Sequence, residues 1–274
     1  MMWGYMRSEE PDRHDRHEDD VRPELREGED TPPWFRLKAV GVHLYTASGV
    51  VLAMLILAAA FQGQVETALW LMLATLVIDS TDGLLARRFR VSEALPFFDG
   101  AMLDNIVDYV TYVFAPVALL WSGGFFPAGN LGLVVAAVPL LASSYQFCRV
   151  DAKTDDHFFL GFPSYFNVLA FYAIVFEMNP GALAALVVGC SLFVFVPIRY
   201  IYPTRTVAFR KLSLLLSALW LVAYAIILLQ LPDPHPLILG FSIAYLFYYF
   251  GLSLFLHGKM VLDERRMEEG EALD

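Results

Sequence analysis

Cysteine is nearly absent from this chain, with Cys148 and Cys190 the two cysteines in 274 residues. Both lie in or beside apolar runs, and neither belongs to a CxxC pair or another metal-ligand spacing. The pattern predicts two reduced, packed thiols and gives no support to a disulfide framework or a thiolate metal site.

Charge is scarce between the two ends of the chain. The net charge is -10, but residues 1–33 hold 11 acidic against 5 basic side chains, and residues 257–274 hold 6 against 3. Apolar residues make up 57% of the chain and mean hydropathy is +0.53, values that favour a membrane protein over a soluble domain. We therefore predict a disordered acidic tail over 1–33, a membrane-embedded catalytic domain over 34–256 and a second tail over 257–274.

Apolar stretches long enough to cross a bilayer, roughly 17–25 residues each, recur along the body. An all-α polytopic membrane protein of about eight helices is predicted, because unpaired strand edges are not tolerated in lipid. The four loops at 62–66, 124–129, 179–180 and 232–235 contain no Lys or Arg, which predicts that both termini are cytoplasmic. The expected spans are 39–61, 67–86, 103–123, 130–148, 163–178, 181–198, 212–231 and 236–256.

Four aspartates lie at helical spacing beside these apolar segments, in the stretch DSTDGLLARRFRVSEALPFFDGAMLDNIVD. Asp79 and Asp82 share one arc of the second predicted helix, and Asp104 and Asp108 share one side of the third. Two antiparallel helices can bring these faces together. Carboxylates clustered near lipid repel one another and are costly to bury, so the pattern predicts a bound divalent cation.

The residue types around the aspartates indicate which metal ion and which kind of substrate the site would bind. Carboxylate-only ligation suits Mg²⁺ or Mn²⁺, ions that commonly retain phosphate oxygens of a substrate. Gly83, Ala86 and Gly100 lie on the same faces and leave room for a bulky group, and Arg87 can offer two donors to a phosphate. No Ser-His-Asp or Cys-His constellation is apparent, so we expect direct transfer in a ternary complex.

The pattern D-x2-D-G-x2-A-R-x12-G-x3-D-x3-D, from Asp79 to Asp108, resembles the signature of the CDP-alcohol phosphotransferases, membrane enzymes of phospholipid synthesis with a six-helix core. The resemblance implies that Asp79, Asp82 and Asp104 hold two divalent ions that grip the CDP diphosphate. Asp108 would also touch the metal site and act as the catalytic general base. The CDP-binding positions implied are Gly83, Ala86, Arg87 and Gly100.

The gap of twelve residues before Gly100 departs from the usual eight of the family. With the eight expected spans, it resembles the bacterial inner-membrane branch that transfers the phosphatidyl group of CDP-diacylglycerol to choline with Mn²⁺ (or Mg²⁺). The family tends to form homodimers.

A quaternary ammonium is best bound by aromatic faces. We predict that choline or the lipid phosphate contacts some members of a set that lies near the same membrane face: Tyr109, Tyr112, Tyr145, Phe158, Arg205 and Arg210.

Two alternatives stay open. The acceptor could instead be glycerol 3-phosphate, serine or inositol, or the chain could be a cation carrier whose aspartates pass the ion. Against the carrier, the acids cluster at one end of the predicted helices and form no relay across the membrane. A nucleic-acid partner is not expected, because the basic residues are scattered and the chain is acidic.

Overall fold

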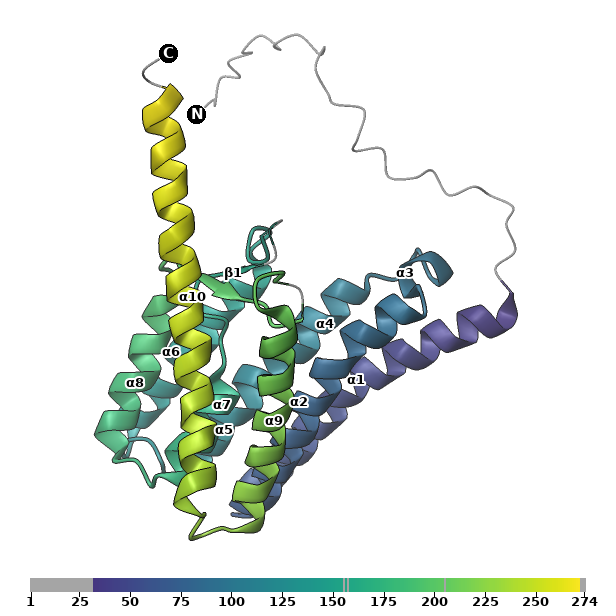
Figure 1. The fold of residues 1–274 in the computed structure, drawn as a ribbon. Coiled ribbons are helices and arrows are strands. Elements are labelled where there is room, and N and C mark those ends of the chain that lie inside the picture. Colours follow the sequence, from purple (N-terminus) through teal and green to yellow (C-terminus); the bar gives the residue numbers. More distant parts are fainter. Residues whose placement is uncertain (1–31, 155, 157, 205, 272–274) are drawn as a thin grey trace, which may run out of the picture.

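The structure is a computed structural model that describes residues 32–154, 156, 158–204 and 206–271. In that part of the chain, six helical segments are long and apolar enough to cross a membrane. They run roughly side by side in a bundle (Figure 1). The segments are α1 (Pro33–Phe61), α2 (Val65–Arg88), the continuous segment α4 (Gly100–Asp108), η2 (Tyr109–Phe114) and α5 (Ala115–Ser122), α6 (Asn130–Cys148), α9 (Arg210–Leu229) and α10 (Pro236–Glu271).

Three shorter helices complete the helical part: α3 (Val91–Ala94), α7 (Phe166–Val175) and α8 (Pro180–Phe193). The helices α7 and α8 occupy the fifth and sixth predicted spans, but they have only 10 and 14 residues. At 1.5 Å per residue these lengths are about 15 and 21 Å, less than the ~30 Å hydrocarbon core. The polytopic helical fold is confirmed, whereas the count of eight spans is not.

A small antiparallel sheet, which the sequence analysis did not predict, lies at one end of the bundle. Strand β1 (Phe158–Leu160) pairs with β2 (Arg199–Ile201). A third segment continues the sheet, because Lys153 forms an isolated bridge to Phe159. This sheet is tied to α10, where the Ser253 hydroxyl accepts from the backbone N–H of Ile201 at 3.1 Å.

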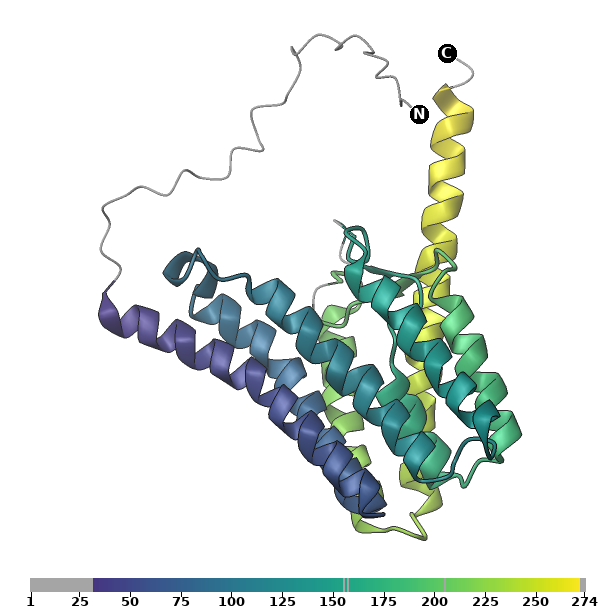
Figure 2. The ribbon, with the colours of Figure 1, turned by 180° about the vertical axis from the view of Figure 1, so that it is seen from behind.

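Helix α1 packs against α2, α4 and α5, and these helices cross one side of the molecule together (Figure 2). The close approach of α1 to α4 depends on Gly49. A Cβ atom at that position would lie 2.6 Å from Cγ1 of Val107, the residue before Asp108. Because glycine has no side chain, it lets the backbone of α1 approach α4 closely.

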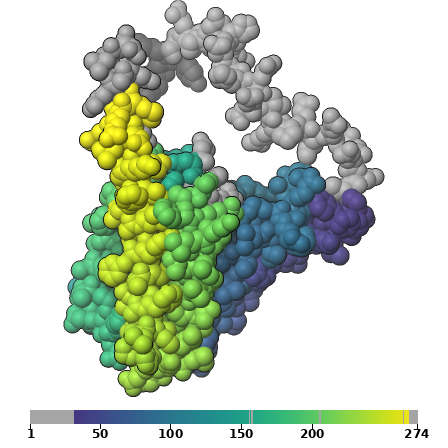
Figure 3. All heavy atoms as spheres, viewed as in Figure 1, coloured from purple at the N-terminus to yellow at the C-terminus, as the bar shows by residue number. Residues whose placement is uncertain are grey.

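Buried side chains of the long helices and of α7 and α8 form the main core. Three polar side chains in it bond to one another: the Trp220 indole donates to the Tyr172 hydroxyl at 2.9 Å, and that hydroxyl also bonds to Ser242. Helix α10 lies beside α9 and extends beyond the rest of the body (Figure 3). The hydrogen bonds among Trp220, Tyr172 and Ser242 join α7, α9 and α10.

The predicted tails can be compared only in part. Residues 1–31 of the expected N-terminal tail lie outside the described residues, and α1 begins at Pro33. The expected C-terminal tail, 257–274, is helical up to Glu271 as the continuation of α10. Both cysteines are free, but Cys148 is exposed, so the expectation of two packed thiols is wrong for that residue.

Candidate active site

Three of the four predicted aspartates converge. Asp79 comes from α2, and Asp104 and Asp108 come from α4, one helical turn apart. One carboxylate oxygen from each of the three residues lies within 4.8 Å of the other two, and each residue is partly buried. The i, i+4 spacing on α4 explains the geometry, because it directs both side chains to the same face.

Asp82 lies one turn further along α2, outside this group of three. Its side chain is buried, and it lies close enough to Asp104 and Asp79 for electrostatic repulsion between the carboxylates. Thr46 of α1 lies beside it. The prediction that all four carboxylates meet in one small volume therefore holds for three of them, with Asp82 at the edge of the cluster towards α1.

The Tyr112 hydroxyl donates a hydrogen bond of 2.5 Å to Oδ2 of Asp79. Tyr112 lies in η2, the π-helical turn that follows Asp108. Pro116, four residues after Tyr112, cannot donate to its carbonyl, and the missing bond accounts for the wider turn. The Tyr112 ring also contacts the ring of Tyr165, at 5.8 Å between centroids. The π turn thus brings a phenol against the carboxylate of a different helix.

Lys153 reaches the same cluster from the sheet. Its ammonium lies 3.4 Å from Oδ2 of Asp104 and 3.3 Å from Oδ1 of Asn105. Burial lowers the pKa of Lys153, but the negative charges of Asp104 and Asp108 outweigh burial and raise the pKa above its usual value. Lys153 is therefore a cation at neutral pH.

The donor set fits a divalent cation of the hard type. It consists of carboxylate oxygens, with no His or Cys among the grouped residues, and such sets suit Mg²⁺ or Mn²⁺. One carboxylate oxygen each of Asp79, Asp104 and Asp108 lies within 4.8 Å of the other two, and negative charges this close to one another favour a bound cation. The single positive charge of Lys153 cannot neutralise three carboxylates, so the remaining negative charge favours the binding of further cations.

The predicted nucleotide residues lie on the two helices that carry the cluster, Gly83, Ala86 and Arg87 on α2 and Gly100 at the start of α4. A Cβ at Gly83 would meet only Nη1 of Arg87, at 3.4 Å, so this face of α2 is open. A Cβ at Gly100 would lie 2.8 Å from Cε1 of His43, whose ring packs on Phe98 at 4.3 Å. Ala86 packs in a small separate core between α1, α2 and α3.

Two other acidic residues of the motif region have structural roles. Asp99 caps α4, because its side chain accepts from the backbone N–H of Met102 at 2.9 Å. Glu93 forms an ion pair with Arg90. Both side chains belong to the connection between α2 and α4 and lie outside the carboxylate group.

The described members of the predicted acceptor set each make different contacts. Of these, Tyr112 touches the carboxylate cluster, whereas Tyr109 donates to the Leu140 carbonyl of α6 at 3.2 Å. Tyr145 packs on Phe195, and Phe158 is buried against β2 and α10. Arg210 is the exposed first residue of α9. Arg205 lies outside the described residues.

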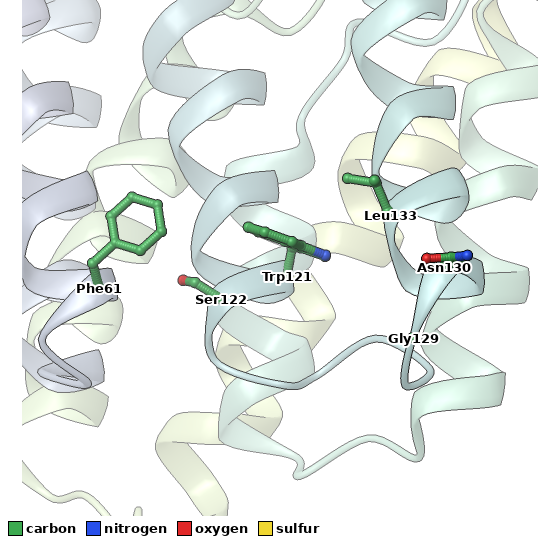
Figure 4. A pocket seen from close by; sticks show the side chains of 6 residues that line it. All are labelled: Phe61, Trp121, Ser122, Gly129, Asn130 and Leu133. Carbon is green, nitrogen blue, oxygen red and sulfur yellow. The ribbon is translucent and has the colours of Figure 1, made fainter.

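A surface cavity of about 560 Å³ lies elsewhere, between the ends of α1 and α5 and the start of α6. Figure 4 shows the Trp121 ring between Phe61 and Leu133. Ser122, Gly129 and Asn130 complete the lining, which contains no ionisable side chain. The described residues that line this cavity therefore offer no carboxylate, imidazole or thiol.

Replacing Tyr112 with Phe should weaken Mn²⁺ binding about tenfold, because the hydroxyl orients the Asp79 carboxylate and loss of such a supporting bond typically lowers metal affinity roughly 10–100-fold. Tyr109→Phe is the matched control, since its hydroxyl bonds to the backbone of α6 and to Ser144. The measurement is an electron paramagnetic resonance titration of free Mn²⁺ against each purified variant. Equal effects of the two substitutions would contradict a specific role of the Tyr112–Asp79 bond.

Comparison with known proteins identifies the family. The family model described as CDP-alcohol phosphatidyltransferase matches residues 43–256, most of the chain and all of the carboxylate cluster. The chain belongs to this family. It is also 36% identical over 223 residues to a phosphatidylcholine synthase of Pseudomonas aeruginosa, covering 81% of this chain and 93% of the relative.

Two Legionella relatives carry the same name. The phosphatidylcholine synthase of Legionella bozemanae is 40% identical over 202 residues, which is 71% of this chain and 93% of the relative. That of Legionella pneumophila is 38% identical over 221 residues, which is 78% of this chain and 86% of the relative. This CDP-alcohol phosphatidyltransferase therefore shares most of its length with them.

Sequence reasoning missed two contacts of the cluster. It assigned Tyr112 to the acceptor set, although Asp104, Asp108 and Tyr112 follow one another at intervals of four residues. That spacing was a usable signal that Tyr112 shares their face. Lys153 carried no such signal, because it lies 49 residues from Asp104 in the chain.

Proposed function

We propose that this protein transfers the phosphatidyl group of CDP-diacylglycerol to choline, giving phosphatidylcholine and CMP. The observation that carries the proposal is the convergence of Asp79, Asp104 and Asp108 at the motif positions of a CDP-alcohol phosphatidyltransferase. Choline as acceptor is supported by the names of the relatives, which are phosphatidylcholine synthases, and by the twelve-residue gap before Gly100.

Two divalent ions, Mn²⁺ or Mg²⁺, would be held by Asp79, Asp82 and Asp104, with Asp108 also touching the metal site. When bound, such ions would neutralise the diphosphate and stabilise charge on the attacking and leaving oxygens. Asp108 would accept the proton of the choline hydroxyl at a carboxylate oxygen. The choline oxygen then bonds to the phosphorus that carries diacylglycerol, the bond from that phosphorus to the CMP oxygen breaks, and CMP leaves.

The remaining motif residues would position the nucleotide. Gly83 offers an open helix face beside Arg87, whose guanidinium would bind a phosphate. Ala86 and Gly100 would flank the cytidine. For choline and the lipid phosphate we retain the predicted set, of which Tyr112 is the member that touches the carboxylates.

We also propose that the carboxylate cluster and both termini face the cytoplasm of a bacterial cell, across its inner membrane. The loops at the carboxylate end hold basic residues, and the four loops at 62–66, 124–129, 179–180 and 232–235 hold none. Residues 34–256 would form the catalytic domain, flanked by acidic tails. A homodimer is proposed from the family resemblance alone.

The test is transfer in proteoliposomes that contain CDP-diacylglycerol and Mn²⁺. Labelled choline, serine, inositol and glycerol 3-phosphate are supplied in separate reactions, and lipid-phase label and free CMP are measured. Label should enter lipid from choline at a rate at least ten times that from any other acceptor. Faster labelling from another acceptor would overturn the choline assignment. Absence of CMP release from folded protein would favour the cation carrier.

A further inference from the structure

Lys153 is a residue that neither the motif nor the family resemblance assigns to a role. It lies between α6 and β1, in a segment held at fixed register. The backbone N–H of Leu160 donates to the Ala152 carbonyl at 2.9 Å, and that of Thr154 donates to the Phe158 carbonyl at 2.9 Å. Strand β1 is in turn paired with β2, which is bonded to α10. Lys153 is therefore presented to the cluster by a fixed backbone.

Its contact with the cluster is loose by comparison. The two ammonium–oxygen distances, 3.4 Å to Asp104 and 3.3 Å to Asn105, exceed the usual range for an N–H···O bond. The side chains of Lys153 and Asp104 remain 44% and 28% exposed. Partly solvated ion pairs of this kind contribute little stability, and the four-carbon stem leaves the ammonium free to change partners.

The charges around Lys153 indicate which group its ammonium would bind after it leaves Asp104. The negative charges of Asp79 and Asp108, as well as that of Asp104, act on the Lys153 ammonium. Divalent ions on the same oxygens would repel the ammonium from Asp104. The anion then nearest to it would be the diphosphate held by those ions, and lysine binds phosphate as a point charge.

We propose that Lys153 is a tethered counter-ion, which pairs with Asp104 before metal binds and binds the diphosphate of CDP-diacylglycerol afterwards. The inference rests on the metal and diphosphate parts of the proposed function, and it is independent of the acceptor. Lys153 is thus a positioning residue for the donor substrate. It competes with Mn²⁺ in the substrate-free protein and holds the nucleotide in the loaded protein.

The two roles predict opposite shifts in one variant. In the purified full-length chain, Lys153→Met should tighten Mn²⁺ binding about fivefold without nucleotide, because it removes a competing charge close to the carboxylates. With Mn²⁺ saturating, the same variant should bind CDP about tenfold more weakly, because a charge-assisted bond to phosphate is lost. Mn²⁺ affinity is read by paramagnetic resonance and CDP affinity by calorimetry.

Three further variants make the result interpretable. Lys153→Gln should reproduce both shifts, and Lys153→Arg should keep both affinities within about threefold of the parent protein. Lys259→Met, which removes an exposed lysine of α10, should change neither affinity. Thermal unfolding without metal identifies any variant that fails to fold.

Only the opposite shifts support the proposal. A fall in both affinities would mean that the segment around Lys153 merely supports the cluster, and an unchanged CDP affinity would remove Lys153 from the diphosphate. Either result overturns the inference. Neither readout uses choline, so a protein with another acceptor would show the same shifts and fail only the acceptor test.

Discussion

Asp108→Asn is expected to lower the rate of phosphatidyl transfer to choline about a thousandfold or more. The substitution removes one of three clustered carboxylates and the proposed base, and general base catalysis alone contributes roughly 10²–10⁴ in rate. Asparagine has nearly the shape of aspartate, so packing around α4 should persist. The measurement is the initial rate of choline incorporation in proteoliposomes, with melting temperature as the check on folding.

Asp99→Asn on the same helix is the matched control. Asp99 caps α4 through the Met102 N–H, and asparagine caps a helix about as well as aspartate. The control should keep activity within about twofold of the parent protein, since a cap change of this kind costs only tenths of a kcal/mol. A comparable loss in both variants, or activity retained in Asp108→Asn, would refute the role given to Asp108.

Gly49→Ala is expected to impair the protein although Gly49 lies outside the motif. The new Cβ would be 2.6 Å from Cγ1 of Val107, and overpacking of this kind costs typically 1–3 kcal/mol. Val107 has a β-branched side chain with few rotamers, so relief requires a shift of α4. Asp108 adjoins Val107, and the shift should lower activity about tenfold or more as well as stability.

Two companion variants separate the clash from a general effect of substitution. Gly41 is on the same helix, and none of the described residues has an atom within 4 Å of the Cβ that Gly41→Ala would add. This substitution should leave stability and activity unchanged or raise stability slightly. Val107→Ala removes the clashing Cγ1 and should restore most of the activity of Gly49→Ala. Failure of this rescue would mean that the α1–α4 contact does not position Asp108.

Periodicity and local spacing predicted much of the fold. The long apolar stretches became the six long helices, and the i, i+4 spacing placed Asp104 and Asp108 on one face towards Asp79. Short elements were harder to predict. Strands β1 and β2 have three residues each, too few to show alternation, and the apolar runs of α7 and α8 exceed the helices that form.

The contacts that complete the site depend on tertiary structure. The bond from Tyr112 to Asp79 requires the π turn before Pro116 as well as the packing of two helices. Lys153 reaches Asp104 because the sheet fixes its backbone, and a basic residue in a loop carries no sign of that. His43 against Gly100 likewise depends on how α1 crosses the start of α4.

Phosphatidyl transfer to choline is tested most directly by its stoichiometry. Labelled choline is added to proteoliposomes containing the protein, CDP-diacylglycerol and Mn²⁺, and lipid-phase label and CMP are quantified in the same samples. The predicted result is equal molar formation of phosphatidylcholine and CMP, both abolished by a chelator and restored by added Mn²⁺. Release of CMP without labelled lipid, or transfer that persists without divalent ions, would contradict the account.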